Sequence, residues 1–393
     1  VVRERALHGT RVSIGKRDLQ GLLIDTGKTS DTRALCHRVR QDLRAIDHQL
    51  AEYAEKLHVL PYLRPTNLDQ ELANIRQDKA YNPTFRYESV SHDILSLRQG
   101  LQKLHPDDSA FGQLCQAKCA ELMIVINMLE ARGDDDRFFE YVQKLYGVPT
   151  EKDASSQLFN IQSSVDADEQ ALNCEEAKKI FEGCLESYGL HDWHVSIKST
   201  MIADCAVGGT SIFLREGATF TRTRLDALIA HEIETHVLTS VNGSAQPFEL
   251  LRAGCAGYLF TQEGLALVNQ ERVLPDGHPK RYLHKITAAG LAYAMHHSFA
   301  ETRAFYVDQG LTEEKAIMKA IDSKRGVLHT VRPGASTRGL VYSRGYDLVT
   351  TYLKAGGNEE VLYVGKMNIN DLPMLQSLDW LEPPLILPHR LRR

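Results

Sequence analysis

Residues 231–236 (HEIETH) place two histidines and a glutamate within one short segment. Neutral imidazoles are common Zn²⁺ ligands, and a glutamate beside the first histidine can take a proton from a water molecule at an open zinc position. The usual HExxH spacing puts the histidines four residues apart on one helix face. Here His231 and His236 are five apart, which separates them by about 140° on an ideal helix. They can share one metal ion only where the helix is distorted, and a π-bulge supplies that distortion.

Taken alone, this segment fits a metal site and a solvated helix face equally well. Its surroundings favour the metal site. Strands are expected just before this helix, which is the order found in zinc peptidases, where an edge strand can pair with a peptide. Apolar residues frame the segment, so its polar groups need buried partners. A candidate third ligand lies downstream in residues 261–266 (TQEGLA).

The elements that must position these residues fall into two groups. Apolar periodicity predicts helices over residues 32–57, 91–104, 111–131 and 138–146, and a polar stretch at about 150–168 is the best linker candidate. A helix over 169–188 is followed by strands at 194–198 and 210–214, with a third strand within 201–207, and then by a strong helix over 224–241. The pattern predicts an α+β, mostly helical protein with an N-terminal helical region (1–150) and a catalytic core (165–393).

Composition limits the classes of function. The chain has 393 residues, a formal net charge of −5, 43% hydrophobic and 25% charged residues, all ordinary for a soluble globular protein. Nothing in this balance indicates a nucleic-acid or membrane partner. No stretch reaches the ~20 apolar residues of a membrane span, and residues 1–5 show no secretory signal. Seven scattered cysteines without a CxxC motif indicate reduced thiols, so we expect a cytoplasmic protein.

Several motifs together resemble a known family. They are QEGLA (262–266) with the preceding GCAGYLFT (254–261), HVLTSVNGSAQP (236–247), KRG (324–326), VYSRG (341–345) and LYVGK (362–366). The sequence resembles the bacterial flavohemoglobin-expression-modulating QEGLA-motif proteins, which are relatives of the microtubule-associated tyrosine carboxypeptidases of animals. Weaker matches extend the resemblance over most of the chain from about residue 35.

The resemblance implies a zincin-like metallopeptidase core, with a small sheet preceding the HExxxH helix and an N-terminal helical region packed on it. It implies that His231, His236 and Glu263 bind one Zn²⁺ per chain and that Glu232 is the catalytic acid/base. The animal relatives remove a C-terminal tyrosine from α-tubulin. The chain departs from the family pattern at Glu234, where glycine is usual, and at Arg338-Gly339, where relatives show Lys-Asp. If that Asp orients a partner, this function is absent here.

A carboxypeptidase must also hold the free α-carboxylate of its substrate, and arginine does this with a bidentate fork. Arg325 in KRG is the first candidate and Arg344 in VYSRG the second, although either could instead form a structural salt bridge. Tyr342 could donate a hydrogen bond to the oxyanion of the tetrahedral intermediate. The alternative is that Tyr342 is a packed side chain whose hydroxyl group is hydrogen-bonded within the protein.

We therefore expect a zinc-dependent metallopeptidase, specifically a carboxypeptidase that removes a C-terminal residue, with tyrosine as the residue that the resemblance suggests. Its partner would be a peptide or protein C-terminus. The alternative is a zinc-containing binding or regulatory protein without turnover, and a fourth protein ligand such as Glu234 would favour it, because structural zinc sites are closed by four ligands. A zinc amidohydrolase acting on a small amide is a third possibility.

Overall fold

The structure is a computed structural model that describes residues 29–57, 59–155, 169–199, 201 and 204–392, with side chains from residue 43 onward. Residues 43–393 form one compact unit. Residues 1–42 form another, of which only the first part of helix α1 (Thr29–Lys56) is described. The larger unit contains every side chain that the sequence proposes for the site.

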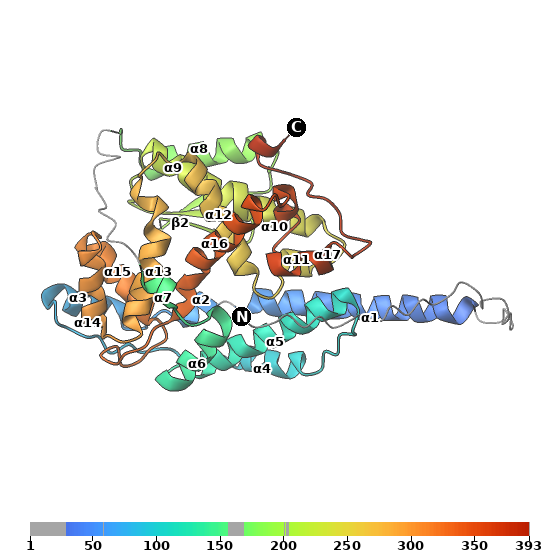
Figure 1. The fold of residues 1–393 in the computed structure, drawn as a ribbon, viewed down its shortest axis with the longest axis horizontal. Coiled ribbons are helices and arrows are strands. Elements are labelled where there is room, and N and C mark those ends of the chain that lie inside the picture. The colour runs from blue at the N-terminus through green and yellow to red at the C-terminus, as the bar shows by residue number, and fades with distance from the viewer. Residues whose placement is uncertain (1–28, 58, 156–168, 200, 202–203, 393) are drawn as a thin grey trace, which may run out of the picture. The chain divides into compact units, whose positions relative to one another are not determined.

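Short helices with polar N-caps make up the first part of the larger unit. They are α2 (Val59–Tyr62), α3 (Leu68–Gln77), α4 (His92–Leu101), α5 (Ala110–Glu130), α6 (Asp135–Tyr146) and α7 (Glu151–Ala154). The side chains of Ser91, Ser109 and Asp134 accept hydrogen bonds from the first turns of α4, α5 and α6, which fixes where these helices begin. Helix α5 packs against α4 and α6, as Figure 1 shows in green. The predicted helices in this region are confirmed.

A small three-stranded sheet follows α8 (Cys174–Ser187). Its strands are β1 (His194–Lys198), β2 (Cys205–Gly208) and β3 (Ser211–Arg215), in the order β1-β3-β2. Strand β3 pairs parallel with β1 and antiparallel with β2, so β2 is an edge strand. Val195, Ile212 and Leu214 are buried and anchor the sheet to the core. The two firmer strand predictions are confirmed to within one residue, and β2 occupies the end of the third.

The segment with the two histidines is one continuous helical run after the sheet. It consists of α9 (Arg222–Leu228), the π-helix η1 (Ile229–Val237) and α10 (Leu238–Ala245). Thr221 caps its start by accepting a hydrogen bond from the backbone N–H of Arg224. The predicted distortion of this helix is confirmed, and it extends over nine residues instead of a single bulge.

Most of the remaining chain is helical. Its elements are α11 (Leu250–Ala253), α12 (Tyr258–Val273), η2 (Pro279–Arg281), α13 (Leu283–Ala294), α14 (Phe299–Asp308), α15 (Glu313–Lys324), η3 (Thr337–Gly339), α16 (Leu340–Lys354), η4 (Glu359–Tyr363), η5 (Ile369–Asp371), α17 (Leu372–Leu375) and η6 (His389–Leu391). Helix α12 contacts both η1 and α16 and lies beside α16 in Figure 1. The α+β, mostly helical class predicted from the sequence is confirmed.

Two glycines allow α12 and α16 to cross closely. A Cβ atom built on Gly264 would collide with the backbone carbonyl of Gly345, and one on Gly345 would collide with the carbonyl oxygen of Phe260. Only glycine lets two helix backbones approach this closely. The crossing therefore brings Glu263, next to Gly264, to the level of Tyr342, one turn before Gly345.

The C-terminal segment is held by side-chain amides of α10. Asn242 donates to the carbonyl oxygen of Ile386 and accepts from its N–H, both at 2.8 Å. Gln246, one turn later, makes the same pair of bonds with the backbone of Glu382, at 2.8 and 3.1 Å. These two family-matched residues thus bind the backbone of the chain's last segment to the helix that continues η1.

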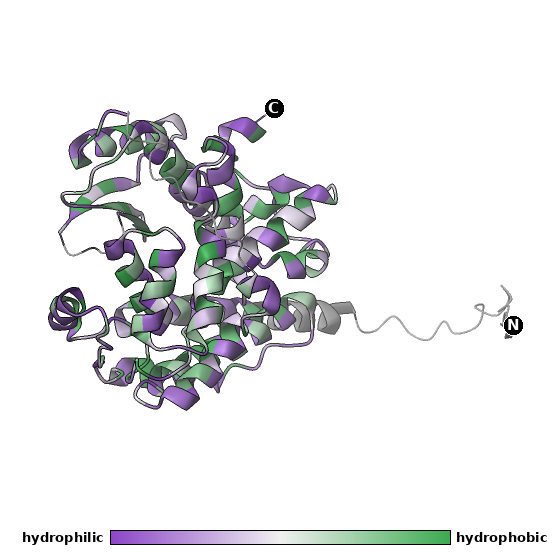
Figure 2. Ribbon diagram, turned by 60° about the vertical axis from the view of Figure 1, so that its left-hand side comes forward, coloured by the Kyte–Doolittle hydropathy of each residue, from purple (hydrophilic) through white to green (hydrophobic). Residues whose placement is uncertain are grey.

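The main hydrophobic core runs through the N-terminal helices, the sheet and the helices around η1. Many helices in Figure 2 have a green apolar side and a purple polar side, as amphipathic helices do. A second cluster surrounds Phe85, Phe299 and Tyr306. Residues on both sides of the proposed 150–168 linker share the main core, and residues 156–168 lie outside the described part of the chain. No described helix combines the length and apolar character needed to cross a bilayer.

Candidate metal centre

The π-helix brings the two histidines to one side. In a π-helix the backbone bonds from residue i to i+5, so residues five apart lie on the same face. The imidazole rings of His231 and His236 are accordingly 5.0 Å apart between centroids. Thr235 supports the wide turn, because its hydroxyl group donates to the carbonyl oxygen of Ala230, five residues earlier, at 3.0 Å. The HExxxH spacing and the local π geometry therefore match each other.

Glu263 from α12 completes a three-residue cluster. Its Oε2 atom lies 3.6 Å from Nε2 of His231 and 3.9 Å from Nε2 of His236. One ligand atom from each residue lies within 4.8 Å of the others. A tetrahedral Zn²⁺ with bonds near 2.1 Å keeps its ligand atoms roughly 3.4 Å apart, so this spacing is close to that of a zinc site.

The polar atoms of the cluster are left without partners inside the described protein. Oε2 of Glu263 and Nδ1 of His231 are buried and have no hydrogen-bond partner there. Burial opposes ionisation of Glu263, but the two histidines and Arg338 outweigh it and hold its pKa at about 2. An ionised buried carboxylate oxygen without a donor is costly unless a cation binds it. The residues therefore fit a divalent metal ion.

Gln262 and Thr239 orient one of the histidines. Nδ1 of His236 lies 3.3 Å from Oε1 of Gln262, which also accepts a hydrogen bond from the Thr239 hydroxyl group at 2.9 Å. A carbonyl oxygen at this position makes Nδ1 the protonated nitrogen and leaves Nε2 free as a ligand atom. In QEGLA, the glutamine thus orients a candidate ligand, the glutamate is itself a candidate ligand and the glycine permits the helix crossing. Sequence reasoning assigned no role to Gln262.

Glu232 lies on the π-helix beside the first histidine and is buried. Its charge acts on His231, on the thiol group of Cys205 and on Tyr342. In the described part of the chain its carboxylate has no hydrogen-bond or ion-pair partner. A carboxylate with this freedom next to the cluster can exchange a proton with a bound molecule.

Glu234, the departure from the family glycine, does not belong to the cluster. Its Oε1 accepts a hydrogen bond from the Tyr188 hydroxyl group at 2.7 Å, and the Tyr188 ring stacks on His389 of the C-terminal segment at 4.2 Å. Its side chain is therefore engaged with α8 and the chain's last residues. Among the described residues, the cluster contains only His231, His236 and Glu263, and no fourth protein ligand joins them.

Both arginines suggested for carboxylate binding have partners within the chain. Arg325 forms an ion pair with Asp322. Arg344 donates to the backbone carbonyl oxygens of residues 146 and 148, at 3.2 and 2.5 Å, and pairs with Asp153 at 3.0 Å. Arg344 thereby ties α16 to the chain around α7. These contacts are those of structural ion pairs, while the carboxylate role of either residue stays a prediction.

Tyr342 lies near the cluster, where the charge of Glu263 acts on its hydroxyl group. The Glu263 carboxylate, followed by burial, raises its pKa well above that of an ordinary tyrosine. Its hydroxyl group therefore remains protonated and able to donate at neutral pH. Arg338 lies one helical turn earlier and acts on Glu263 as well, so it belongs to the same surroundings. The sequence marked Arg338 only as a departure from the family, although its i, i+4 spacing from Tyr342 could have linked the two.

The lysine of the KRG motif has a structural role. The side chain of Lys324 is fully buried, and its Nζ lies 2.7–3.2 Å from four backbone carbonyl oxygens, those of Ala294, His297, Arg332 and Gly334. It therefore ties the end of α13 and the loop before η3 to α15. This anchoring fixes the loop that leads into η3, the turn that contains Arg338.

A cleft of about 630 Å³ lies near the cluster, although none of the three cluster residues lines it. Three of its lining residues interact electrostatically with site residues: the charge of Glu232 acts on Cys205, that of Lys280 on His231 and that of Asp322 on Tyr342. The edge strand β2 contributes Cys205, and the remaining walls come from α9, η2, α13 and α15.

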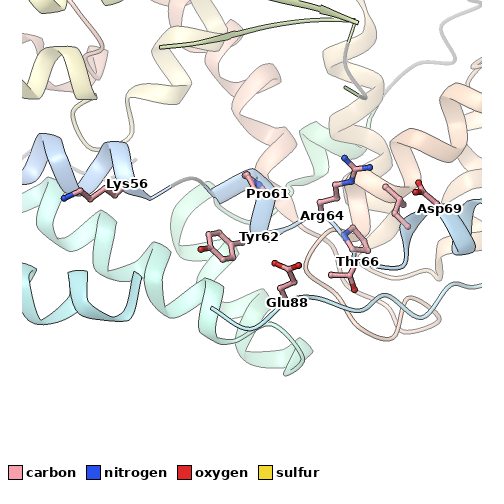
Figure 3. Close-up of a pocket in the computed structure, with 9 residues that line it drawn as sticks. Lys56, Pro61, Tyr62, Arg64, Thr66, Asp69 and Glu88 are labelled. Atoms are coloured by element: carbon pink, nitrogen blue, oxygen red, sulfur yellow. The ribbon is translucent and has the colours of Figure 1, made fainter. Parts of the chain in front are cut away.

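A second hollow, of about 520 Å³, lies near the end of α1 and beside α2 and α3 (Figure 3). Its walls include the side chains of Lys56, Tyr62, Arg64, Asp69 and Glu88. It shares no residue with the cluster or the cleft. Its lining contains no group of histidine, cysteine and acidic residues that could hold a metal ion.

Comparison with known proteins indicates the family to which a chain with this cluster belongs. No curated protein matches the chain. A family model described as microtubule-associated tyrosine carboxypeptidase matches residues 74–393, which include the whole cluster, Glu232, Tyr342 and the cleft. This family has a carboxypeptidase-like function and so indicates a peptide or protein substrate. The match covers most of the sequence, and the chain therefore belongs to the microtubule-associated tyrosine carboxypeptidase family.

Proposed function

We propose that the protein is a zinc-dependent metallocarboxypeptidase that releases the C-terminal residue of a peptide or protein. The observation that carries the proposal is the convergence of His231 Nε2, His236 Nε2 and Glu263 Oε2 around a buried point, with the glutamate oxygen lacking any donor. Three protein ligands leave one position of a tetrahedral ion open, as catalytic zinc sites do. The sheet that precedes the ligand helix supports a zincin-like core.

Zn²⁺ held by these three residues would polarise the scissile carbonyl group and lower the pKa of a water molecule there. Glu232 would take a proton from that water molecule as the water oxygen forms a bond to the carbonyl carbon. Glu232 then gives the proton to the leaving amine as the C–N bond breaks. Tyr342 donates a hydrogen bond to the oxyanion of the tetrahedral intermediate.

The substrate would lie extended in the cleft, with its backbone beside the edge strand β2. Edge strands offer unpaired N–H and C=O groups that can bind a peptide backbone without reading its sequence. The family description suggests a C-terminal tyrosine as the released residue. The six described cysteines are all free, which supports a reducing compartment such as the cytoplasm.

The alternative of a zinc-containing regulatory protein without turnover predicts a closed site with four protein ligands. Glu234 was the candidate fourth ligand, and it bonds to Tyr188 instead. The partner-free carboxylate of Glu232 also has no structural task to explain it. These two observations favour turnover.

The test is zinc content by mass spectrometry on the wild type, Glu263→Ala and Glu234→Ala. Glu234→Ala is a matched control, since it removes a carboxylate from the same helix without touching the cluster. We expect about one zinc per chain in the wild type and in the control, and loss of zinc in Glu263→Ala. Peptides with varied C-termini are then screened for release of the last residue, with Glu232→Gln as the inactive control. A wild type that binds no zinc even after reconstitution would refute the proposal.

A further inference from the structure

Arg338 lies on the same side of one helical run as Tyr342. The 3-10 turn η3 leads directly into α16, so residues 337–354 are continuously helical and the two side chains are one turn apart. The crossing of Gly264 with Gly345 presses this part of α16 against α12. That contact places the side with Arg338 and Tyr342 next to the candidate ligand Glu263.

The guanidinium group of Arg338 is surrounded by hydroxyl groups and by one carboxylate. Tyr146, Tyr342, Glu263 and Tyr258 are the groups that act on its charge most strongly. It donates a hydrogen bond to the Tyr146 hydroxyl group. No carboxylate of the described residues forms an ion pair with Arg338. Arg338 thus differs from Arg325 and Arg344, which each have an acidic partner.

A metal ion bound to Glu263 would take up the negative charge that now faces Arg338. The guanidinium group, which is partly exposed, would then have neutral phenols as its strongest remaining neighbours. A guanidinium group presents five N–H donors, which exceed what the Tyr146 oxygen can accept. A partly buried guanidinium with free N–H donors is stabilised by an incoming anion, and a carboxylate matches its planar fork.

We propose that Arg338 binds the α-carboxylate of the substrate's C-terminal residue. This assignment rests on the proposed carboxypeptidase function. A carboxypeptidase cleaves the last peptide bond, so the free carboxylate lies one residue, at most about 3.6 Å of extended chain, beyond the scissile carbonyl. The anchor must therefore adjoin the metal ligands, as Arg338 does. Tyr258 and Tyr342 flank it and are placed to bind the same end of the peptide.

The experiment measures binding, not turnover. Glu232→Gln serves as the parent protein, so that peptides are not consumed. Fluorescein-labelled hexapeptides, one for each of the twenty C-terminal residues, are prepared as free acids and as carboxamides. Their affinities are measured by fluorescence anisotropy for the parent protein and for double variants that also carry Arg338→Gln, Arg338→Lys or Arg325→Gln. Arg222→Gln, an exposed arginine on α9, controls for the loss of one positive charge.

We expect the parent to bind the best free acid about 10- to 100-fold more tightly than its carboxamide, the range for a charge-assisted hydrogen bond. Arg338→Gln should abolish this preference while leaving carboxamide binding unchanged. Arg338→Lys should keep part of it, and Arg222→Gln all of it. Zinc content and thermal melting of each variant confirm that the site is intact.

If Arg338→Gln still prefers free acids over carboxamides, the assignment is overturned. If only Arg325→Gln loses that preference, Arg325 is the carboxylate-binding residue instead. A parent that binds zinc but shows no preference for free acids would refute any carboxylate anchor. A wild type without zinc or peptide release would instead refute the proposed function. The two failures therefore give different results.

Discussion

Replacing Gly264 with alanine tests whether the close helix crossing holds the metal ligand in place. The added methyl group would fall inside the contact distance of the Gly345 carbonyl oxygen. Because the obstacle is backbone, the two helices would have to separate by roughly 1 Å to restore ordinary contact distances. Overpacking of this kind costs about 1–3 kcal/mol of folding stability. Glu263, the adjacent residue, would move with its helix.

The matched control is Gly183→Ala in α8, where no atom lies within 4 Å of the added methyl group. Alanine is the better helix former there, so this variant should gain about 0.5–1 kcal/mol. The same substitution is thus expected to lower the free energy of unfolding at Gly264 and to raise it at Gly183.

Unfolding in urea with a chelator present measures the stability of the metal-free protein. Zinc affinity is then measured by competition with a chromophoric chelator. We expect Gly264→Ala to lower the unfolding midpoint and to weaken zinc binding at least tenfold, as displaced ligand geometry does. If Gly264→Ala were as stable as the wild type and bound zinc as tightly, the argument that this crossing positions Glu263 would be refuted.

Three further predictions concern single side chains. Burial lowers the pKa of His284 to about 4, and neither ring nitrogen has a hydrogen-bond partner in the described residues. The unfolded state therefore binds more protons between pH 6.5 and 4, so stability is full above pH 6.5 and falls by up to ~3 kcal/mol as the pH drops to 4. His284→Leu should flatten this dependence in urea titrations run at several pH values, and an unchanged slope would contradict it. Lys324→Met leaves buried carbonyl oxygens without a donor and should cost at least about 3 kcal/mol by the same assay, whereas a loss below 1 kcal/mol would argue against the anchoring role. Asn242→Ala removes both bonds to Ile386, and hydrogen exchange should show faster exchange at the Ile386 amide.

The sequence predicts the parts of the site that depend on local spacing. His231 and His236, five residues apart, required a distorted helix, and the structure has a π-helix there. The strand at 194–198 and the helices before it followed from apolar periodicity. Glu263 entered through the QEGLA motif, and the structure brings it to the two histidines.

The features of the site that could not be predicted from the sequence depend on contacts between distant segments. Glu234 stays out of the cluster while its carboxylate accepts a hydrogen bond from Tyr188, 46 residues earlier. Arg338 stood out in the sequence only as a departure from the family pattern, and the packing of α12 against α16 brings it near Glu263. Gln262 orients His236 because α12 packs against η1, which no local pattern in the sequence states.

The bonds from Asn242 and Gln246 to the final segment have a consequence for how the protein matures in the cell. Synthesis proceeds from the N-terminus, so the HExxxH helix is made well before residues 382–386, with which Asn242 and Gln246 bond. The helix that carries both histidines consequently gains these bonds only once residues 382–386 have left the ribosome. A chain shortened before residue 382 lacks them, so its HExxxH helix is held less firmly than in the full sequence.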